Sequence, residues 1–443
     1  MTPRNHPQLT KILRLLEINE LAKQTGFCAR KARKINAEDL VTSFYHLVGS
    51  DSFNLRQWAY NLSLLSNSTI SFQAIAKRLD YRQETFFQSL FQKCLLLKLQ
   101  EGLNYPVQEI FRSFNHVLIE DSTCFNLPRS LFEFFPGARL PHGRKAGGRI
   151  QLCMNIKDHT YHSIVLQSYC QNDASFAGNI LQSIQQGDLI IRDLGYWSIP
   201  TMANIHKKEA NFLTRFRLTN KLFCPTTKEP IDLERYLRKQ DQMKNTQVDI
   251  PCLLGHGYQF PVRFVAIKSS DKQTEQRIRS AKKQRHKNCP ISSRSKYLMS
   301  WSLYVTNVSG EVLSIQDIQK AYQIRWHIEM MFKSWKGKFN LNSFFKNCKG
   351  RNPVKPNIIL LLILSWLVLN FMKTFNHLST IVWEKFQRIL SPMRYASYLI
   401  THPEIISKID DPMTHKMLAY YSSYDKRKDR KNHFEKTYMI SLS

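Results

Sequence analysis

Two aspartates stand where short apolar runs end. Asp121 closes the run "VLIED" and Asp193 closes "LIIRD". Runs of this kind are typical of buried strands, and the carboxyl ends of strands in an α/β sheet are common places for ligands and metal ions. An aspartate there often does no more than begin a turn, so neither residue indicates a function by itself.

A third acidic residue lies in the amphipathic segment "IQKAYQIRWHIEMMFKSWKGKF", residues 318–339. Its polar members Tyr322, Arg325, Glu329 and Lys336 fall within about 60° of one another at about 100° per residue. The opposite face is apolar and suits packing on a sheet. A solvated stripe with Arg325 and Glu329 paired four residues apart is the simpler interpretation. The mixture of carboxylate, cations and a phenol in a very basic chain favours a functional stripe.

Phosphoryl transfer is the chemistry that such residues could perform together. Carboxylate oxygens are the ligands that Mg²⁺ prefers. In two-metal catalysis one ion activates a water or a 3′-hydroxyl while the other stabilises the leaving oxygen. We therefore expect Asp121, Asp193 and Glu329 to bind two Mg²⁺ or Mn²⁺ ions. Nearby arginine and lysine side chains would hold a DNA backbone.

The charge of the chain also indicates a polyanionic partner. Its 443 residues include 64 Lys and Arg against 34 Asp and Glu, a net charge of +30. Contacts with phosphates release condensed counterions, so very basic proteins usually bind nucleic acid. An anionic membrane surface is the alternative. The apolar run 358–372 is shorter than the roughly 20 residues of a spanning helix, so we interpret it as a buried helix.

The remaining composition predicts a cytoplasmic protein. The N-terminal residues carry no long apolar core of a signal peptide. The 9 cysteines show no zinc-binding spacing, and we expect them to be reduced.

The elements that must position the acidic residues follow from changes of pattern along the chain. Residues 1–110 predict a helical DNA-binding region, in which 71–99 fits either a helix-turn-helix or a plain bundle. Residues 111–217 alternate strands and helices, as does an α/β catalytic core. Residues 218–300 predict a β-rich insertion, with a hairpin around Gly255 and an exposed basic loop. Residues 301–345 return to the core with one long helix carrying Glu329, and 346–443 form a helical C-terminal region.

The acidic residues and the polar stripe resemble a known family. The spacing of Tyr322, Arg325, Glu329 and Lys336 is similar to the Y-R-E-K signature of IS-four-type insertion-sequence transposases, the group that includes the transposase of transposon Tn-five. The segments "IEDST" and "DLIIRDLGYWS" resemble its first-Asp and second-Asp motifs. The three motifs occur in the family's order and cover about residues 115–340.

This resemblance implies an RNase H-like core, with the β-rich insertion before the last catalytic helix, and cut-and-paste transposition. Hydrolysis would nick each terminal inverted repeat, the freed 3′-hydroxyl would form a hairpin, and the reopened end would join target DNA. The partners would be double-stranded DNA and a second copy of the chain, in a bacterial, nucleoid-associated setting. A decayed transposase that binds its repeats as a repressor, and a structure-specific nuclease on the same fold, are the alternatives.

The resemblance also implies roles for individual residues. The metal ligands would be Asp121, Asp193 and Glu329. The contacts to phosphates near the terminal nucleotide would come from Tyr322, Arg325 and Lys336. Trp301 would stack on a flipped base, although a core tryptophan at the start of a strand is an equally good interpretation. We expect the segment 141–149, with His142, Arg144 and Lys145, to be a glycine-rich surface turn, and 279–288 to contact phosphates without sequence preference.

Overall fold

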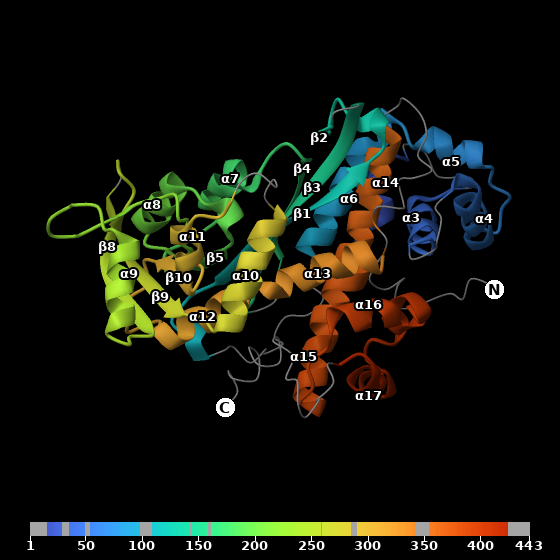
Figure 1. Ribbon diagram of the computed structural model, residues 1–443. Helices are drawn as coiled ribbons and strands as arrows, with labels where there is room; N and C mark the ends of the chain where they lie inside the picture. Colours follow the sequence, from blue (N-terminus) through green and yellow to red (C-terminus); the bar gives the residue numbers. More distant parts are fainter. Residues whose placement is uncertain are drawn as a thin grey trace.

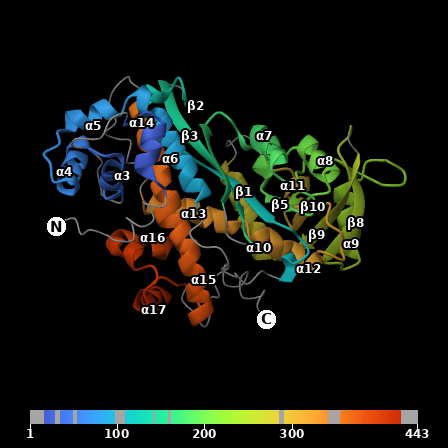
Figure 2. The same cartoon turned by 180° about the vertical axis from the view of Figure 1, so that it is seen from behind.

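The computed structural model describes residues 16–28, 35–48, 54–97, 109–140, 143–157, 161–257, 259–284, 290–339, 341 and 354–423. A twisted sheet with its covering helices forms one part of the molecule (Figures 1 and 2). Helices from both ends of the chain lie side by side in the other part, and a helix of the sheet layer, α13 (Trp326–Gly337), lies between the two.

The sheet is mixed, which confirms the predicted α/β class. Its order is β2-β3-β1-β5-β6-β10-β9-β8-β7, with β4 pairing to β3. The central strand β1 is parallel to β5 and antiparallel to β3, β5 is parallel to β6, and β6 is antiparallel to β10. These core strands are β1 (Val117–Leu127), β3 (Gly143–Asn155), β4 (Tyr161–Ser168), β5 (Leu189–Arg192), β6 (Asn211–Arg215) and β10 (Trp301–Thr306), with β2 (Pro136–Leu140) at one edge.

The central strands β1 and β5 are covered on both faces, to which alternate residues of a strand point. Ile119 and Ile191 belong to a core shared with the helical part, whereas Leu118 and Ile190 belong to a separate core under α8 (Ile199–Lys207) and α9 (Leu233–Gln242). Continuous apolar runs are typical of strands covered on both sides. This is why the runs before Asp121 and Asp193 lack polar alternation.

The region predicted to be an insertion extends the same sheet. The hairpin expected around Gly255 is confirmed as β8 (Gln247–Leu254) and β9 (Phe260–Lys268), with β7 (Leu222–Phe223) beyond it. The expected exposed loop is wrong, because Asp271–Gln284 forms helix α10 and Ser293–Leu298 forms α11. Arg277 of α10 reaches the carbonyl oxygens of Met299 and Trp301, so the helix is anchored to the sheet.

Two further expectations are corrected. The glycine-rich segment 141–149 is not a surface turn, because β3 begins at Gly143; His142 lies outside the described residues. The single long helix is two helices, α12 (Ile315–Gln323) and α13, with Ile324 and Arg325 between them.

The helical part joins α2–α6 to the C-terminal helices. Its members are α2 (Ile18–Gln24), α3 (Ala37–Tyr45), α4 (Leu55–Ser66), α5 (Phe72–Arg78), α6 (Glu84–Leu96), α14 (Val354–Trp366), a π-helical stretch (Leu367–Lys373), α15 (Thr374–Phe386), α16 (Pro392–Thr401) and α17 (Pro412–Tyr421). Residues 354–386 are long and apolar enough to cross a membrane, but 94% of their most apolar window is buried inside the protein. The buried-helix interpretation of 358–372 is therefore confirmed.

Candidate functional site

The register of the sheet places the two aspartates beside each other. Glu120 of β1 lies opposite Arg192 of β5, so Asp121 and Asp193 are the next residues on neighbouring parallel strands. Glu120 and Arg192 form a buried ion pair of 2.6 Å on the other face. Because side chains alternate along a strand, this pair leaves both aspartates facing the side on which α13 packs.

Helix α13 brings the third acidic residue to the same place through Arg325. The Arg325 Nη1 donates to Asp121 Oδ2 at 2.6 Å, and its Nη2 pairs with Glu329 Oε1. The break between α12 and α13 places Arg325 immediately before the first turn of α13, with Glu329 one turn later. One guanidinium therefore lies between two carboxylates that are 208 residues apart in the sequence.

Electrostatics show that the three carboxylates influence one another. Burial raises the pKa of Asp121 from 3.8 to about 7, Arg325 opposes this shift, and the charges of Asp193 and Glu329 add to it. The pKa of Arg325 is lowered by burial, but Tyr322 and the three acids outweigh that effect, so the net shift is upward. The structure thus brings Asp121, Asp193, Glu329, Tyr322 and Arg325 into one site.

Of the two other predicted residues, Lys336 lies beside this site, whereas Trp301 belongs to the core on the opposite face of the sheet. Lys336, near the end of α13, is an exposed residue; desolvation of its ammonium lowers its pKa, and the nearby Cys124 and Asp121 act in the opposite direction. Trp301 is 2% exposed at the start of β10, and the Lys268 ammonium lies 4.7 Å from its ring centroid. Stacking of Trp301 on a base stays a prediction.

The residue types of the three acids, though not their spacing in this structure, suit hard divalent cations. Three carboxylates converge, and carboxylate oxygens are the usual ligands of Mg²⁺. Within the described ranges, no group of three His, Cys, Asp or Glu side chains has the spacing to hold a metal ion. Arg325 occupies the space between Asp121 and Glu329, and its presence there shows that the carboxylates attract a cation.

Two groups of residues beside the carboxylates were missed from the sequence. Arg215 ends β6 opposite Tyr304. Its guanidinium lies 5.6 Å from the centroid of the Tyr322 ring, which also packs on Tyr304. The available signal was a basic residue at the end of the predicted strand in 211–215.

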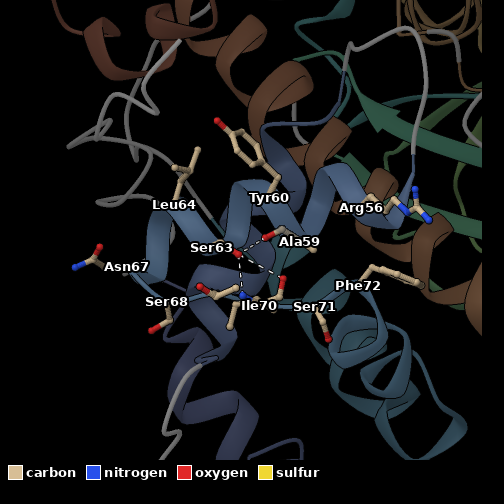
Figure 3. A pocket seen from close by; sticks show the side chains of 11 residues that line it. Arg56, Ala59, Tyr60, Ser63, Leu64, Asn67, Ser68, Ile70, Ser71 and Phe72 are labelled. Atoms are coloured by element: carbon tan, nitrogen blue, oxygen red, sulfur yellow. Dashed lines mark hydrogen bonds between the residues drawn. The ribbon is translucent and has the colours of Figure 1, made fainter.

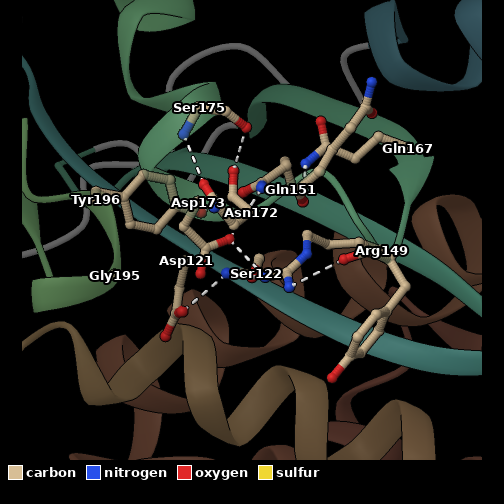
Figure 4. A network of polar contacts seen from close by, with 12 residues as sticks. Asp121, Ser122, Arg149, Gln151, Gln167, Asn172, Asp173, Ser175, Gly195 and Tyr196 are labelled. Atoms are coloured by element: carbon tan, nitrogen blue, oxygen red, sulfur yellow. Dashed lines mark hydrogen bonds and ion pairs between the residues drawn. The ribbon is translucent and has the colours of Figure 1, made fainter. Parts of the chain in front are cut away.

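The second missed group surrounds Asp173 (Figure 4). Arg149 Nη1 donates to Asp173 Oδ1 at 2.7 Å, and Gln151 Nε2 donates to the same oxygen at 3.0 Å. Arg149 also donates to the hydroxyl of Ser122, next to Asp121. No local pattern pointed to this group, because its members come from three separate segments.

A surface hollow between α4 and α5 does not compete with the carboxylates as the site of chemistry. Its side chains include Arg56, Tyr60, Ser63 and Phe72, and Figure 3 shows Ser63 bonded within the hollow. None of its lining residues is acidic.

Similar proteins are found by sequence and by structure. The family model "Transposase DDE domain" matches residues 112–367. The transposase for insertion sequence element IS231B of Bacillus thuringiensis subsp. berliner is 26% identical over 345 residues, covering 73% of this chain and 71% of the relative. That for IS1151 of Clostridium perfringens is 24% identical over 348 residues, covering 74% and 72%. A solved piggyBac transposase synaptic complex with hairpin DNA covers 95% of this chain and 84% of its own, with 10% identity and a TM-score of 0.42.

Proposed function

The chain belongs to the DDE transposase family, and from this premise we propose that Asp121, Asp193 and Glu329 are the residues with which it cleaves and joins DNA at the ends of an insertion sequence. The matched range 112–367 includes all three. The observation that carries the proposal is the convergence of these carboxylates on Arg325 from two strands and a helix. Arg325 bridges the first and third acids, and the second is the neighbour of the first in the sheet.

The three carboxylates would hold two Mg²⁺ or Mn²⁺ ions. When bound, such ions supply an activated hydroxyl and stabilise the leaving oxygen in phosphoryl transfer. Arg325 offsets part of the negative charge of Asp121 and Glu329, and its planar donors also match a DNA phosphate. Lys336 would hold the backbone beside the reacting phosphate, and Tyr322 would support Arg325 from the same stripe.

The finer features of the family resemblance are part of this proposal. We assign β4-β3-β1-β5-β6 to an RNase H-like core, since the two aspartates leave neighbouring parallel strands at one edge. The Y-R-E-K stripe supports an IS-four-type enzyme with hairpin formation, terminal inverted repeats and target DNA as substrates, and a homodimer that joins two ends. The net charge of +30 supports binding to long DNA in the bacterial nucleoid.

The test is Glu329→Gln in purified protein given Mg²⁺ and DNA that carries the terminal repeats of its own element. We expect cleavage to be abolished while end binding in a gel-shift assay is retained, because the amide keeps the shape and loses the charge. Glu234→Gln is the matched control: Glu234 is also half-buried on a helix and pairs with an arginine four residues away, Arg238, far along the sheet from the site.

Each outcome of this test assigns one function. Cleavage and joining by the wild type but not by Glu329→Gln support the transposase. Cleavage without joining would indicate a nuclease, and end binding without any nick would indicate a repressor. Equal cleavage by wild type and Glu329→Gln would remove Glu329 from the metal ligands.

A further inference from the structure

We propose that Asp173 is a positioning residue that fixes the turn of Asp193 against the strand of Asp121. The inference rests on the proposed function, because it assumes that these two aspartates act together. Asp173 begins helix α7 (Asp173–Phe176), whose first turn is capped by the Asn172 side chain. The Asp173 carboxylate is therefore free of the capping role and faces the sheet.

One branch of contacts joins Asp173 to the strand of the first aspartate. Arg149 Nη1 lies 2.7 Å from Asp173 Oδ1 and 2.8 Å from the Ser122 hydroxyl. The backbone N–H of Ser122 donates to Asp121 Oδ1 at 2.8 Å. Asp173 thus acts on Asp121 through Arg149 and Ser122 (Figure 4).

A second branch joins Asp173 to the turn of the second aspartate. Gln151 Nε2 donates to Asp173 Oδ1, and the Gln151 amide oxygen accepts from the hydroxyl of Tyr196. Tyr196 is 1% exposed and ends the 3₁₀ turn Leu194–Tyr196, which Asp193 caps through Gly195. The phenol is locked by burial, so its hydroxyl holds the end of this turn in place.

Gly195 shows how closely the two acids approach. A Cβ at Gly195 would lie 2.9 Å from both Asp173 Oδ2 and Asp193 Oδ1. The two oxygens are therefore at most about 5.8 Å apart, the sum of these two distances. Two carboxylates at this distance repel each other, and Arg149 supplies the charge that keeps Asp173 in place.

The matched control is an ion pair of the same kind outside the site. Arg149 and Asp173 are 13% and 19% exposed, and Arg263 and Asp249 on β9 and β8 are 13% and 23% exposed. Loss of either pair removes a half-buried charge contact, so Asp173→Asn and Asp249→Asn should lower the melting temperature by similar amounts. Asp173 is linked to the two proposed catalytic aspartates and Asp249 is not. A difference in Mn²⁺ binding between the two variants therefore tests the positioning role.

The experiment measures Mn²⁺ binding to the DNA-free protein by electron paramagnetic resonance, with cleavage of end DNA at rising Mn²⁺ as a second readout. We expect Asp173→Asn to raise the half-saturating Mn²⁺ concentration by roughly 10–100-fold, the usual effect of residues that orient metal ligands. End binding should stay within about threefold, since Asp173 holds a protein arginine and not DNA. Asp249→Asn should bind Mn²⁺ as the wild type does.

The result that overturns the inference is equal Mn²⁺ binding by Asp173→Asn and Asp249→Asn while Asp193→Asn is inactive. If Asp193→Asn itself binds Mn²⁺ and cleaves normally, it is the proposed function that fails. If Asp173→Asn does not fold, Tyr196→Phe, which removes only a hydroxyl, replaces it in the test. It should weaken Mn²⁺ binding in the same direction, and unchanged binding would count against the positioning role.

Discussion

Asp121→Asn should stabilise the metal-free protein at alkaline pH. Burial, together with Asp193 and Glu329, raises the pKa of Asp121 from 3.8 to about 7 despite the ion pair with Arg325. At about 1.4 kcal/mol per pH unit, the fold disfavours the ionised side chain by about 4 kcal/mol. Asp121 is only 14% exposed, so solvent screens little of this cost.

The sign of the effect follows from proton linkage. Below pH 3.8 Asp121 is protonated in both the folded and the unfolded chain, and ionisation costs nothing. Between pH 3.8 and about 7 the unfolded chain loses the proton while the folded chain keeps it, so the free energy of unfolding falls by about 1.4 kcal/mol per pH unit. Above about pH 7 the full cost is present. Asparagine cannot ionise, so the Asp121→Asn variant does not carry this cost of ionisation. Arg325 stays paired with Glu329 in the variant.

The assay is urea denaturation of wild type and Asp121→Asn in metal-free buffer at pH 4.5 and pH 8. The difference between the two proteins cancels the titration of all other groups. We expect the variant to gain about 3 kcal/mol more at pH 8 than at pH 4.5, because about 1 kcal/mol of the cost is already present at pH 4.5. Excess Mg²⁺ at pH 8 should stabilise the wild type by about 2.7 kcal/mol at 100 times its Kd and the variant by less. An equal difference at both pH values would refute the reasoning.

Two further changes test the surroundings of the site. Lys336→Ala should weaken complexes with end DNA and reduce the salt slope of binding by about one, as measured by fluorescence anisotropy; an unchanged slope would place Lys336 outside the DNA interface. Arg192→Met leaves Glu120 buried without its partner and should cost about 3–5 kcal/mol in urea denaturation, with part of the loss recovered by adding Glu120→Gln. A loss below about 1 kcal/mol in the single variant would show that the pair contributes little.

The sequence indicates the carboxylates because their signals are local. Residues 117–119 and 189–191 are apolar at every position, which is typical of strands buried on both faces. The polar stripe that carries Glu329 could be predicted from the periodicity of an α-helix alone. Local patterns therefore predicted which acidic residues would share a face, and the sheet register brought them together.

The break before α13 has no such local signal. The segment contains neither glycine nor proline, yet Arg325 and Ile328 bond to carbonyls three residues back, which tightens the turn. Arg325 is bonded to Asp121 on β1, a tertiary contact. A contact across about 200 residues outweighs a uniform helical pattern, and periodicity alone cannot reveal it.

The glycines before Arg149 were misinterpreted for a physical reason. Glycine-rich stretches usually form turns, but a Cβ at Gly148 would lie 2.5 Å from the ring of Phe125 on the paired strand. The missing side chain of Gly148 therefore leaves room for the Phe125 ring to lie across β3, and the chain does not turn there. The strand then continues to Arg149 and Gln151, which reach Asp173 in a separate segment of the chain.

The charge of the site argues for a divalent cation more strongly than the residue types do. A carboxylate 2.6 Å from a guanidinium ordinarily has a lowered pKa, yet that of Asp121 is raised to about 7. One monovalent cation is therefore too little to offset burial and two neighbouring acids. If Arg325 served only to neutralise a structural cluster, its one charge would suffice for the carboxylates. The pKa of Asp121 would then lie below its usual value. We therefore expect the remaining negative charge to favour a divalent ion at the three carboxylates, and Asp121→Asn to weaken its binding by removing one ligand.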